Sequence, residues 1–367
     1  MVTEIIIIAV LASLACAVPG VFLLLKRMAL ISDAISHSIL PGIVIGFLVK
    51  ESLNTPYPII GAVAYAMLMV VTVEALSQSG LVKGDTAIAV VFPPLFSIGV
   101  LLVSLYANNV HLDTDAVLLG ELAFAPFDRV VILGHSLPAS MVKMAIILLI
   151  NLGVLVLLFK ELKVSTFDPI LSRSLGFSPA LLHYLLMFIT SITAVGAFDS
   201  VGAILVLAFM ITPTATALLL TSSLVVMIII TFSIATVSSI AGVLVAIRID
   251  SGISGAITTV MGLFFVLAYL FSPSVGVVTK IRNKRRLASE YALSIVLYHL
   301  AHHCDEDDME SECSLSHLRL QFNYGPRYLK RVVHLGMQRG LIEEIGEVFH
   351  LTDEGKAVHV DTLRLHH

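Results

Sequence analysis

The first three quarters of this 367-residue chain contain little charge. Residues 1–279 contain 10 basic residues (Lys and Arg) and 13 acidic residues (Asp and Glu). The much shorter segment 280–367 contains 12 basic and 13 acidic residues. An average soluble domain is about 25% charged. This excludes an ordinary soluble domain for residues 1–279 and allows one for residues 280–367. The composition therefore predicts a transmembrane domain over 1–279 and a separate soluble domain after it.

Other absences narrow the function further. The three cysteines, Cys16, Cys304 and Cys313, are too few for the disulfide framework of a small secreted scaffold. The N-terminus lacks the basic segment of a cleavable signal peptide, so the first apolar stretch is expected to remain as a helix. The chain has no GxxxxGK motif followed by Ser or Thr, and this excludes ATP binding through a P-loop. Any energy-dependent activity would therefore draw on a partner or an ion gradient.

Residues 1–279 contain a series of apolar stretches, and a bilayer-spanning helix needs roughly 20 such residues. The stretches are continuous rather than alternating, which favours helices over a β-barrel. Some are separated by only one or two residues, so eight spans remain an alternative to nine. The nine candidate stretches are 5–25, 28–49, 57–77, 86–106, 141–159, 181–197, 200–220, 223–247 and 253–271.

Basic residues are distributed unevenly among the connecting segments, and an excess of Lys and Arg marks the cytoplasmic side. This bias predicts a multi-pass protein of the bacterial inner (cytoplasmic) membrane, with the C-terminal domain in the cytoplasm. The longest connection, 107–140, is expected as an external loop. The connecting segments of the cytoplasmic set carry Lys26, Arg27, Lys83, Lys160, Lys163, Arg173 and the basic residues of 280–286.

The second apolar stretch carries two ionisable residues, Asp33 and His37. They are four residues apart, so on a helix they share one face. Ionisable groups inside a span are costly and indicate a functional site by default. A carboxylate and an imidazole make half of a tetrahedral site for Zn²⁺, Mn²⁺ or Fe²⁺, which a second subunit would complete. The alternative is a structural Asp–His hydrogen bond. Gly42 and Gly46 follow and allow close approach of another helix.

Three segments in order resemble motifs of one known family. The first runs from Arg27 through Asp33 and His37 to Leu40-Pro41-Gly42. The other two are Phe167-Asp168-Pro169 with Arg173 and Gly176, and Val201-Gly202 with Pro213, Ala215 and Ala217. Over about residues 5–275 the chain is similar to the permease subunits of zinc, manganese and iron ABC importers, the ABC-3 family.

The resemblance implies a function and partners. Asp33 and His37 would be the ligands of a transported divalent metal, and no permanent cofactor is expected. A cytoplasmic ABC ATPase, a second permease subunit and an extracellular metal-binding protein would complete the system. The chain itself would be a transport subunit and not an enzyme. Neither the metal nor the choice between homodimer and heterodimer can be inferred from the residues.

The segment 160–180 has the signals of a short helix. Asp168 can cap a helix over 169–176, with Pro169 at its first position and Gly176 at its end. The family resemblance implies that this is the coupling helix that contacts the ATPase, through Phe167, Asp168, Pro169, Arg173 and Gly176. An ordinary capped loop is the alternative.

The C-terminal part is expected to begin with a basic juxtamembrane linker, 280–287, whose basic residues suit a contact with lipid headgroups. Helical patterns follow at 288–303, 315–322 and 326–339, and a hairpin pattern at 341–351. In the first helical pattern Leu287, Tyr291, Ile295 and Tyr298 share a face. The complete sequence predicts an all-α polytopic membrane protein followed by a small cytoplasmic winged helix-turn-helix domain over 288–367. Its segment from Gly340-Leu341-Ile342 to His350-Leu351-Thr352-Asp353-Glu354-Gly355 resembles the wing of many bacterial regulators, including the iron/manganese-dependent repressor family.

Two further sites are candidates in this domain. Arg327, Lys330 and Arg331 on the third helix are positioned to contact DNA. However, the domain lacks the basic surplus typical of DNA-binding proteins, so a regulatory or oligomer-contact role is favoured over nucleic-acid binding. A cytoplasmic metal sensor is the other candidate, formed by His299, His302, His303 and Cys304.

The leading prediction is therefore a metal importer permease with a regulatory C-terminal domain. Two alternatives remain. A membrane-tethered, metal-responsive transcription regulator would use the C-terminal domain on DNA. A gradient-driven secondary transporter would need no ATPase, and its inverted repeats are not evident.

Overall fold

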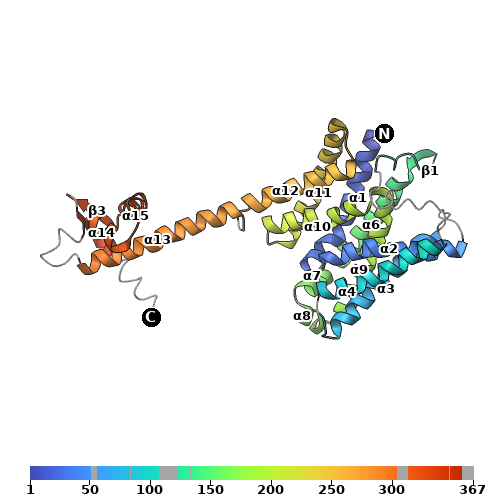
Figure 1. Cartoon of the computed structure of the whole chain (residues 1–367), viewed down its shortest axis with the longest axis horizontal. Coiled ribbons are helices and arrows are strands. Elements are labelled where there is room, and N and C mark those ends of the chain that lie inside the picture. The colour runs from blue at the N-terminus through green and yellow to red at the C-terminus, as the bar shows by residue number, and fades with distance from the viewer. Residues whose placement is uncertain are drawn as a thin grey trace. The chain divides into compact units, whose positions relative to one another are not determined.

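The computed structural model describes residues 1–50, 56–82, 84–106, 122–132, 134–273, 275–303, 313–346 and 348–357. The chain divides into two compact units, Met1–Ser274 and Val275–His367. We call them the membrane unit and the C-terminal unit. Each has its own buried apolar core, and Figure 1 shows the elements of both.

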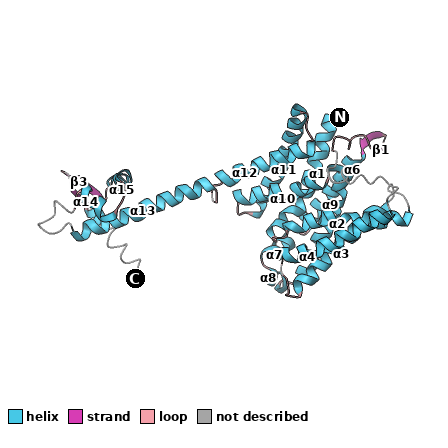
Figure 2. Ribbon diagram, in the orientation of Figure 1, coloured by secondary structure: helices cyan, strands magenta, loops and turns pink. Residues whose placement is uncertain are grey.

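In the described part of the membrane unit the regular secondary structure is helical apart from one short hairpin (Figure 2). Within the described residues, nine of its helices have the length and apolar composition to span a bilayer. This agrees with the larger of the two predicted span numbers. The nine are α1 (Val2–Leu25), α2 (Ala29–Lys50), α3 (Pro56–Gln78), α4 (Asp85–Tyr106), α6 (Ala139–Leu157), α9 (Pro179–Val201), α10 (Ala203–Leu220), α11 (Leu224–Ile249) and α12 (Ile253–Phe271).

Helix α1 forms much of the core of this unit and packs against α6, α9, α10 and α11. At Gly20 it lies so close to α10 that an added Cβ would overlap the Met210 carbonyl. Asn151 in α6 donates hydrogen bonds to the Ala15 carbonyl of α1 (2.9 Å) and to Thr193 Oγ1 of α9 (2.8 Å). Small residues and buried polar bonds of this kind hold helices together in lipid.

The segment expected as the external loop 107–140 contains an antiparallel hairpin of β1 (Arg129–Ile132) and β2 (His135–Pro138). The Arg129 guanidinium donates to Ser136 Oγ (2.9 Å), to the Ser136 carbonyl (2.8 Å) and to Glu4 Oε1 of α1 (3.0 Å). One arginine thus joins the two strands and fixes them to the start of α1. Residues 107–121 lie outside the described part of the chain.

Two short helices connect α6 to α9. They are α7 (Phe159–Phe167) and α8 (Pro169–Ser174). Helix α7 packs against α1, α6 and α9, and α8 packs against α7 and α9. The sequence predicted α8 but not α7, because the charged residues Lys160, Glu161 and Lys163 follow the preceding apolar stretch and are typical of a connecting segment.

The C-terminal unit contains α13 (Val277–His303), α14 (Leu315–Phe322), α15 (Pro326–Gln338) and a hairpin of β3 (Ile342–Ile345) and β4 (Val348–Leu351). This is the predicted order of helices and hairpin. Residues 280–287, expected as a linker, lie within α13. The winged helix-turn-helix assignment stays a prediction.

Candidate functional site

Asp33 and His37 both lie in α2, close to its start. The chain enters α2 through a tight turn in which Arg27 has a left-handed backbone (φ 59°) and the Met28 N–H donates to the Leu23 carbonyl. At 1.5 Å per residue, His37 lies about 12 Å along the axis from Ala29. Asp33 is half-buried. The side chain of His37 lies outside the described part of the structure, so the structure gives no distance between the two groups.

Serines beside the pair bond to the helix itself. Ser32 Oγ donates to the Ala29 carbonyl (2.8 Å), Ser36 Oγ to Ser32 O (2.9 Å) and Ser38 Oγ to Ala34 O (2.6 Å). Such bonds are how hydroxyls are satisfied inside a helix. Asp33 and His37 are therefore the two side chains of this segment with strong metal-ligand chemistry.

Two neighbouring helices fix the position of α2. A Cβ added to Gly42 would overlap the Gly61 carbonyl of α3, and one added to Gly46 would overlap the Tyr57 carbonyl. On another side, Gly99 of α4 packs directly on the ring of Pro41. The predicted close approach at Gly42 and Gly46 is thus present, and α3 is the partner. Helix α2 is clamped one turn beyond His37, which suits a site that must keep its geometry.

Pro41 has a second consequence for α2. Proline has no N–H, so it cannot supply the usual helix hydrogen bond to the carbonyl of residue 37. Helix α2 nevertheless continues through this position to Lys50. The helix hydrogen bond that is missing because of Pro41 is therefore the one to the carbonyl of His37, a candidate metal-binding residue.

The predicted cap of α8 is present. Asp168 Oδ1 accepts hydrogen bonds from the backbone N–H groups of Ile170 (3.1 Å) and Leu171 (2.9 Å). Pro169 occupies the first turn, and Gly176 follows the helix with φ +84°. Ser172 is buried while Arg173 is exposed. Helix α8 therefore has a capped N-terminus, and the chain changes direction at Gly176 after its C-terminus.

The outer surface of this segment is apolar although it lies between predicted spans. Phe167, Ile170, Leu171 and Leu175 are all exposed. Exposed apolar side chains grouped on a short connecting helix are typical of a protein contact surface. The sequence motif identified Phe167 as a site residue but not its three aliphatic neighbours.

A charged cluster that the sequence analysis did not predict lies where α1, α3 and α9 meet. His183 Nε2 of α9 is 3.7 Å from Glu74 Oε2 of α3, which is longer than a hydrogen bond. Glu74 Oε1 accepts a hydrogen bond from Gln78 (2.9 Å). Burial lowers the pKa of Lys26, just beyond α1, and the charge of Glu74 partly opposes that shift. No short sequence pattern joins Lys26, Glu74 and His183, since they lie far apart in the chain.

The proposed metal-sensor residues of the C-terminal unit differ in environment. His299 is buried, stacked near His317 (ring centroids 5.9 Å) and edge-on to Phe322. His302 is exposed and stacked on Tyr298 (4.2 Å). Cys304 and the side chain of His303 lie outside the described residues. Among the residues that are described, no group of three or more His, Cys, Asp and Glu is placed to hold a metal ion.

The candidate DNA-contacting residues Arg327, Lys330 and Arg331 are exposed on α15. Helix α15 packs on α13 and β3 through its other face, where Leu329, Val332 and Val333 are buried. These basic side chains are therefore available to an anionic partner.

Comparison with known proteins identifies the family. The ABC 3 transport family matches residues 1–272, almost the whole membrane unit. The chain is 48% identical over 355 residues to the zinc transport system membrane protein TroD of Treponema pallidum, covering 97% of each chain. It is 43% identical over 272 residues to the manganese transport system membrane protein MntD of Bacillus subtilis, covering 74% of this chain and 92% of MntD.

One solved structure is also similar. The structure of PsaBC from Streptococcus pneumoniae in complex with Fab matches with a TM-score of 0.62 at 26% identity, over 74% of this chain and 91% of that one. The family match covers most of the chain, and the nine candidate spans agree with it. The chain therefore belongs to the ABC 3 transport family and is a multi-pass membrane permease subunit without an ATPase site of its own.

Proposed function

We propose that this permease imports a divalent transition metal and that Asp33 and His37 bind the ion during its passage. The observation that carries the proposal is the placement of this pair, four residues apart in a helix clamped by α3 and α4. Relatives are named for zinc and for manganese transport. Carboxylate and imidazole ligands suit both ions and Fe²⁺, so the substrate class is Zn²⁺, Mn²⁺ or Fe²⁺.

The pair would act with its counterpart in a second permease subunit. Two ligands from each subunit would give four around the ion, and these replace the water that the ion loses on entering the membrane. An extracellular metal-binding protein would deliver the ion. Either an identical or a related second permease satisfies this arrangement.

Energy would reach the site from a separate cytoplasmic ABC ATPase. The exposed apolar side chains of Phe167, Ile170, Leu171 and Leu175 make α8 the best candidate for its contact surface. Arg173 adds a charged group at the same surface. Because Asp168 caps α8 and Gly176 ends it, the helix can move as a rigid piece and transmit force to α9.

The C-terminal unit would regulate transport. It lies outside the part of the chain that matches the family and has a separate core. TroD, by contrast, matches over nearly the full length of this chain. As a separate unit that follows the last candidate span in the chain, it would modulate the permease without taking part in the metal path.

The test is metal uptake in cells starved of transition metals that express the chain with its ATPase and binding protein. Cellular zinc, manganese and iron would be measured by mass spectrometry for the native chain, Asp33→Ala and His37→Ala. The matched control is Ser36→Ala, which removes a hydroxyl that donates to the Ser32 carbonyl of its own helix. We expect one metal to accumulate with the native chain and the control, and to stay at background in both ligand variants.

Normal uptake in both ligand variants, at equal membrane abundance, would refute the site assignment. Accumulation without any ATPase would instead indicate a gradient-driven transporter. Specific, metal-dependent DNA binding by the full chain would support the tethered-regulator alternative for the C-terminal unit.

A further inference from the structure

Helix α13 has two apolar faces, and among the residues that the structure describes only one of them packs inside the C-terminal unit. Ala292, Leu293, Val296, Leu297 and Leu300 are buried in the core of the unit. The other face exposes Leu287 (55%), Tyr291 (64%), Ile295 (44%) and Tyr298 (50%). We call these four residues the α13 stripe. Exposed apolar side chains arranged along one helix face require a partner surface.

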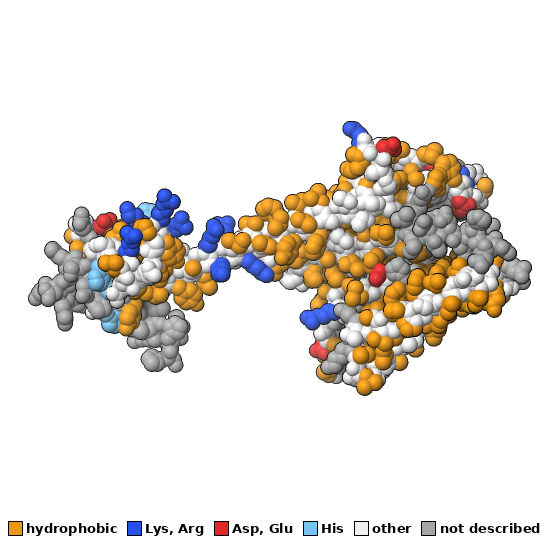
Figure 3. All heavy atoms as spheres, in the orientation of Figure 1, with side chains coloured by type: hydrophobic (Ala, Val, Ile, Leu, Met, Phe, Trp, Pro, Cys, Tyr) orange, Lys and Arg blue, Asp and Glu red, His pale blue; other side chains and the backbone are white. Residues whose placement is uncertain are grey.

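The stripe continues into positive charge at its N-terminal end. Residues three, four and seven positions apart share a helix face, so Lys280 and Lys284 lie in line with Leu287 and Tyr291. Arg282, Arg285 and Arg286 lie on the other side of α13, turned more than a quarter of a turn from this line, and all five basic residues are exposed. Figure 3 shows Lys and Arg side chains gathered along the first half of α13. One face of the helix is therefore cationic at its start and apolar beyond.

The chain connection keeps this helix near the bilayer. The last candidate span, α12, ends at Phe271, and α13 begins at Val277. Five intervening residues reach at most about 20 Å even when fully extended. The cationic start of α13 is thus held within reach of the phospholipid headgroups.

We propose that α13 binds the cytoplasmic surface of the membrane, with the α13 stripe at the headgroup–acyl boundary and the basic residues on anionic phospholipids. A helix with apolar residues on one side and nearby Lys and Arg lies in that interface. Tyrosine prefers the same depth, because its ring is apolar and its hydroxyl remains hydrated. Lysines at the end of the stripe can extend their ammonium groups to the phosphates.

The charge of α13 favours a lipid partner over a second copy of the chain. Parallel pairing of two stripes would bring two basic segments together, and like charges oppose that pairing. A bilayer containing anionic lipid is complementary to both parts of the face. The opposite face of α13 would keep its core contacts, so the C-terminal unit can stay folded while the stripe is in lipid. The proposal holds whichever ion is transported.

The experiment uses the absence of tryptophan from the chain. Tyr291→Trp gives the full-length permease a single fluorescent probe on the stripe. The matched control is Leu320→Trp, in α14 of the same unit, where the native side chain is 83% exposed. Each variant is placed in nanodiscs with brominated acyl chains, containing either phosphatidylglycerol or only phosphatidylcholine. Tyr298→Trp repeats the measurement about two turns further along α13.

We expect phosphatidylglycerol nanodiscs to quench the tryptophan emission of Tyr291→Trp at least about twofold more than that of the Leu320→Trp control, with a shift to the blue. High salt and all-zwitterionic lipid should remove most of this difference, since both weaken the electrostatic contact. Equal quenching of stripe and control would overturn the proposal. A blue shift without quenching would show that protein covers the stripe, and quenching independent of lipid charge would exclude the role of the basic residues.

Discussion

His183 Nε2 in α9 lies 3.7 Å from Glu74 Oε2 in α3. Helix α9 also packs against the capped helix α8. Helix α3 packs closely against α2, where Gly61 of α3 contacts Gly42 of α2. The contacts α8–α9, His183–Glu74 and Gly61–Gly42 therefore form a continuous series of packed elements. This series joins the proposed ATPase contact to the helix of Asp33 and His37.

Glu74→Gln is expected to destabilise the permease because Lys26 is half-buried and would lose a nearby negative charge. Lys26→Met should also destabilise it, since Glu74 would then lose a cation. Adding Lys26→Met to Glu74→Gln should cost less than the two separate losses, by about 0.5–3 kcal/mol. Thermal unfolding of the four proteins in one detergent measures this coupling. Strictly additive losses would show that the two groups do not interact.

Alkaline pH should act on the same cluster. Burial lowers the pKa of Lys26, so the folded protein releases this proton before the unfolded chain does. Stability linked to Lys26 therefore rises with pH through this range, toward the ordinary lysine pKa near 10.4. The slope of unfolding midpoint against pH should be smaller in Lys26→Met than in the native chain. An unchanged slope would contradict the burial of this ammonium group.

Gly42→Ala should lower stability by about 1–3 kcal/mol, because its Cβ would overlap the backbone of α3 and force the helices apart. Gly153→Ala is the matched control in α6, where an added Cβ meets no atom within 4 Å. That change should be neutral or stabilising by up to about 1 kcal/mol. Thermal unfolding distinguishes the two. Equal effects would mean that α2 and α3 can separate at little cost.

Asp168→Ala should weaken α8 by about 0.5–2 kcal/mol and reduce metal-stimulated ATP hydrolysis in the assembled transporter. Asp168→Asn should retain most activity because asparagine caps equally well. Comparing ATP hydrolysis and uptake in the two variants tests the cap. If Asn is as damaging as Ala, the negative charge at Asp168 matters more than the hydrogen bonds to Ile170 and Leu171.

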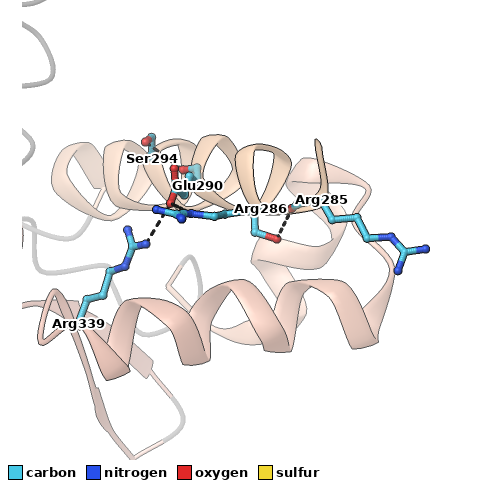
Figure 4. Close-up of polar contacts among 6 residues, drawn as sticks. Arg285, Arg286, Glu290, Ser294 and Arg339 are labelled. Carbon is cyan, nitrogen blue, oxygen red and sulfur yellow. Dashed lines mark hydrogen bonds and ion pairs between the residues drawn. The ribbon is translucent and has the colours of Figure 1, made fainter. Parts of the chain in front are cut away.

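Acid should loosen the contact between α13 and α15. Figure 4 shows Glu290 accepting hydrogen bonds from Arg286 Nε (3.1 Å) and Arg339 Nη2 (3.2 Å). These bonds lower the pKa of Glu290, so its contribution is present above about pH 4.5 and is lost as pH falls through the lowered pKa.

The measurement is hydrogen exchange of α13 and α15 in the full chain, corrected for intrinsic rates, between about pH 3.5 and 6. Glu290→Gln should reduce the dependence of protection on pH, whereas Glu343→Gln, on an exposed position of β3, should not. Because exposed ion pairs contribute little, the effect should be small and weaken in salt. A full pH dependence in Glu290→Gln would assign it to other groups.

Local signals predicted much of this molecule. The spans could be found because lipid demands long apolar helices, and nine lie where such stretches occur. The cap at Asp168 depends only on backbone groups two and three residues away, so the sequence around it is sufficient. Asp33 and His37 were notable as ionisable residues in an apolar stretch, although their role stays a proposal.

Contacts between residues far apart in the sequence could not be predicted in this way. Helical spacing identified Leu287, Tyr291, Ile295 and Tyr298 as one face of a helix, but α13 is apolar on two sides and the core uses the other. The approach of His183 to Glu74 depends on how α3 and α9 pack. Strands β1 and β2 have four residues each, too few for a periodic signal, and Arg129 fixes them through a contact with distant Glu4.

The position of the C-terminal unit also sets an order of events during synthesis. Domains of a growing chain form as units, with the N-terminal one first. Since the unit occupies residues 275–367, the ribosome completes α2 and α8 before it begins this part. Insertion into the membrane and binding of the ATPase can thus start on a nascent permease. The proposed regulation by the C-terminal unit would begin only after residues 275–367 have been made.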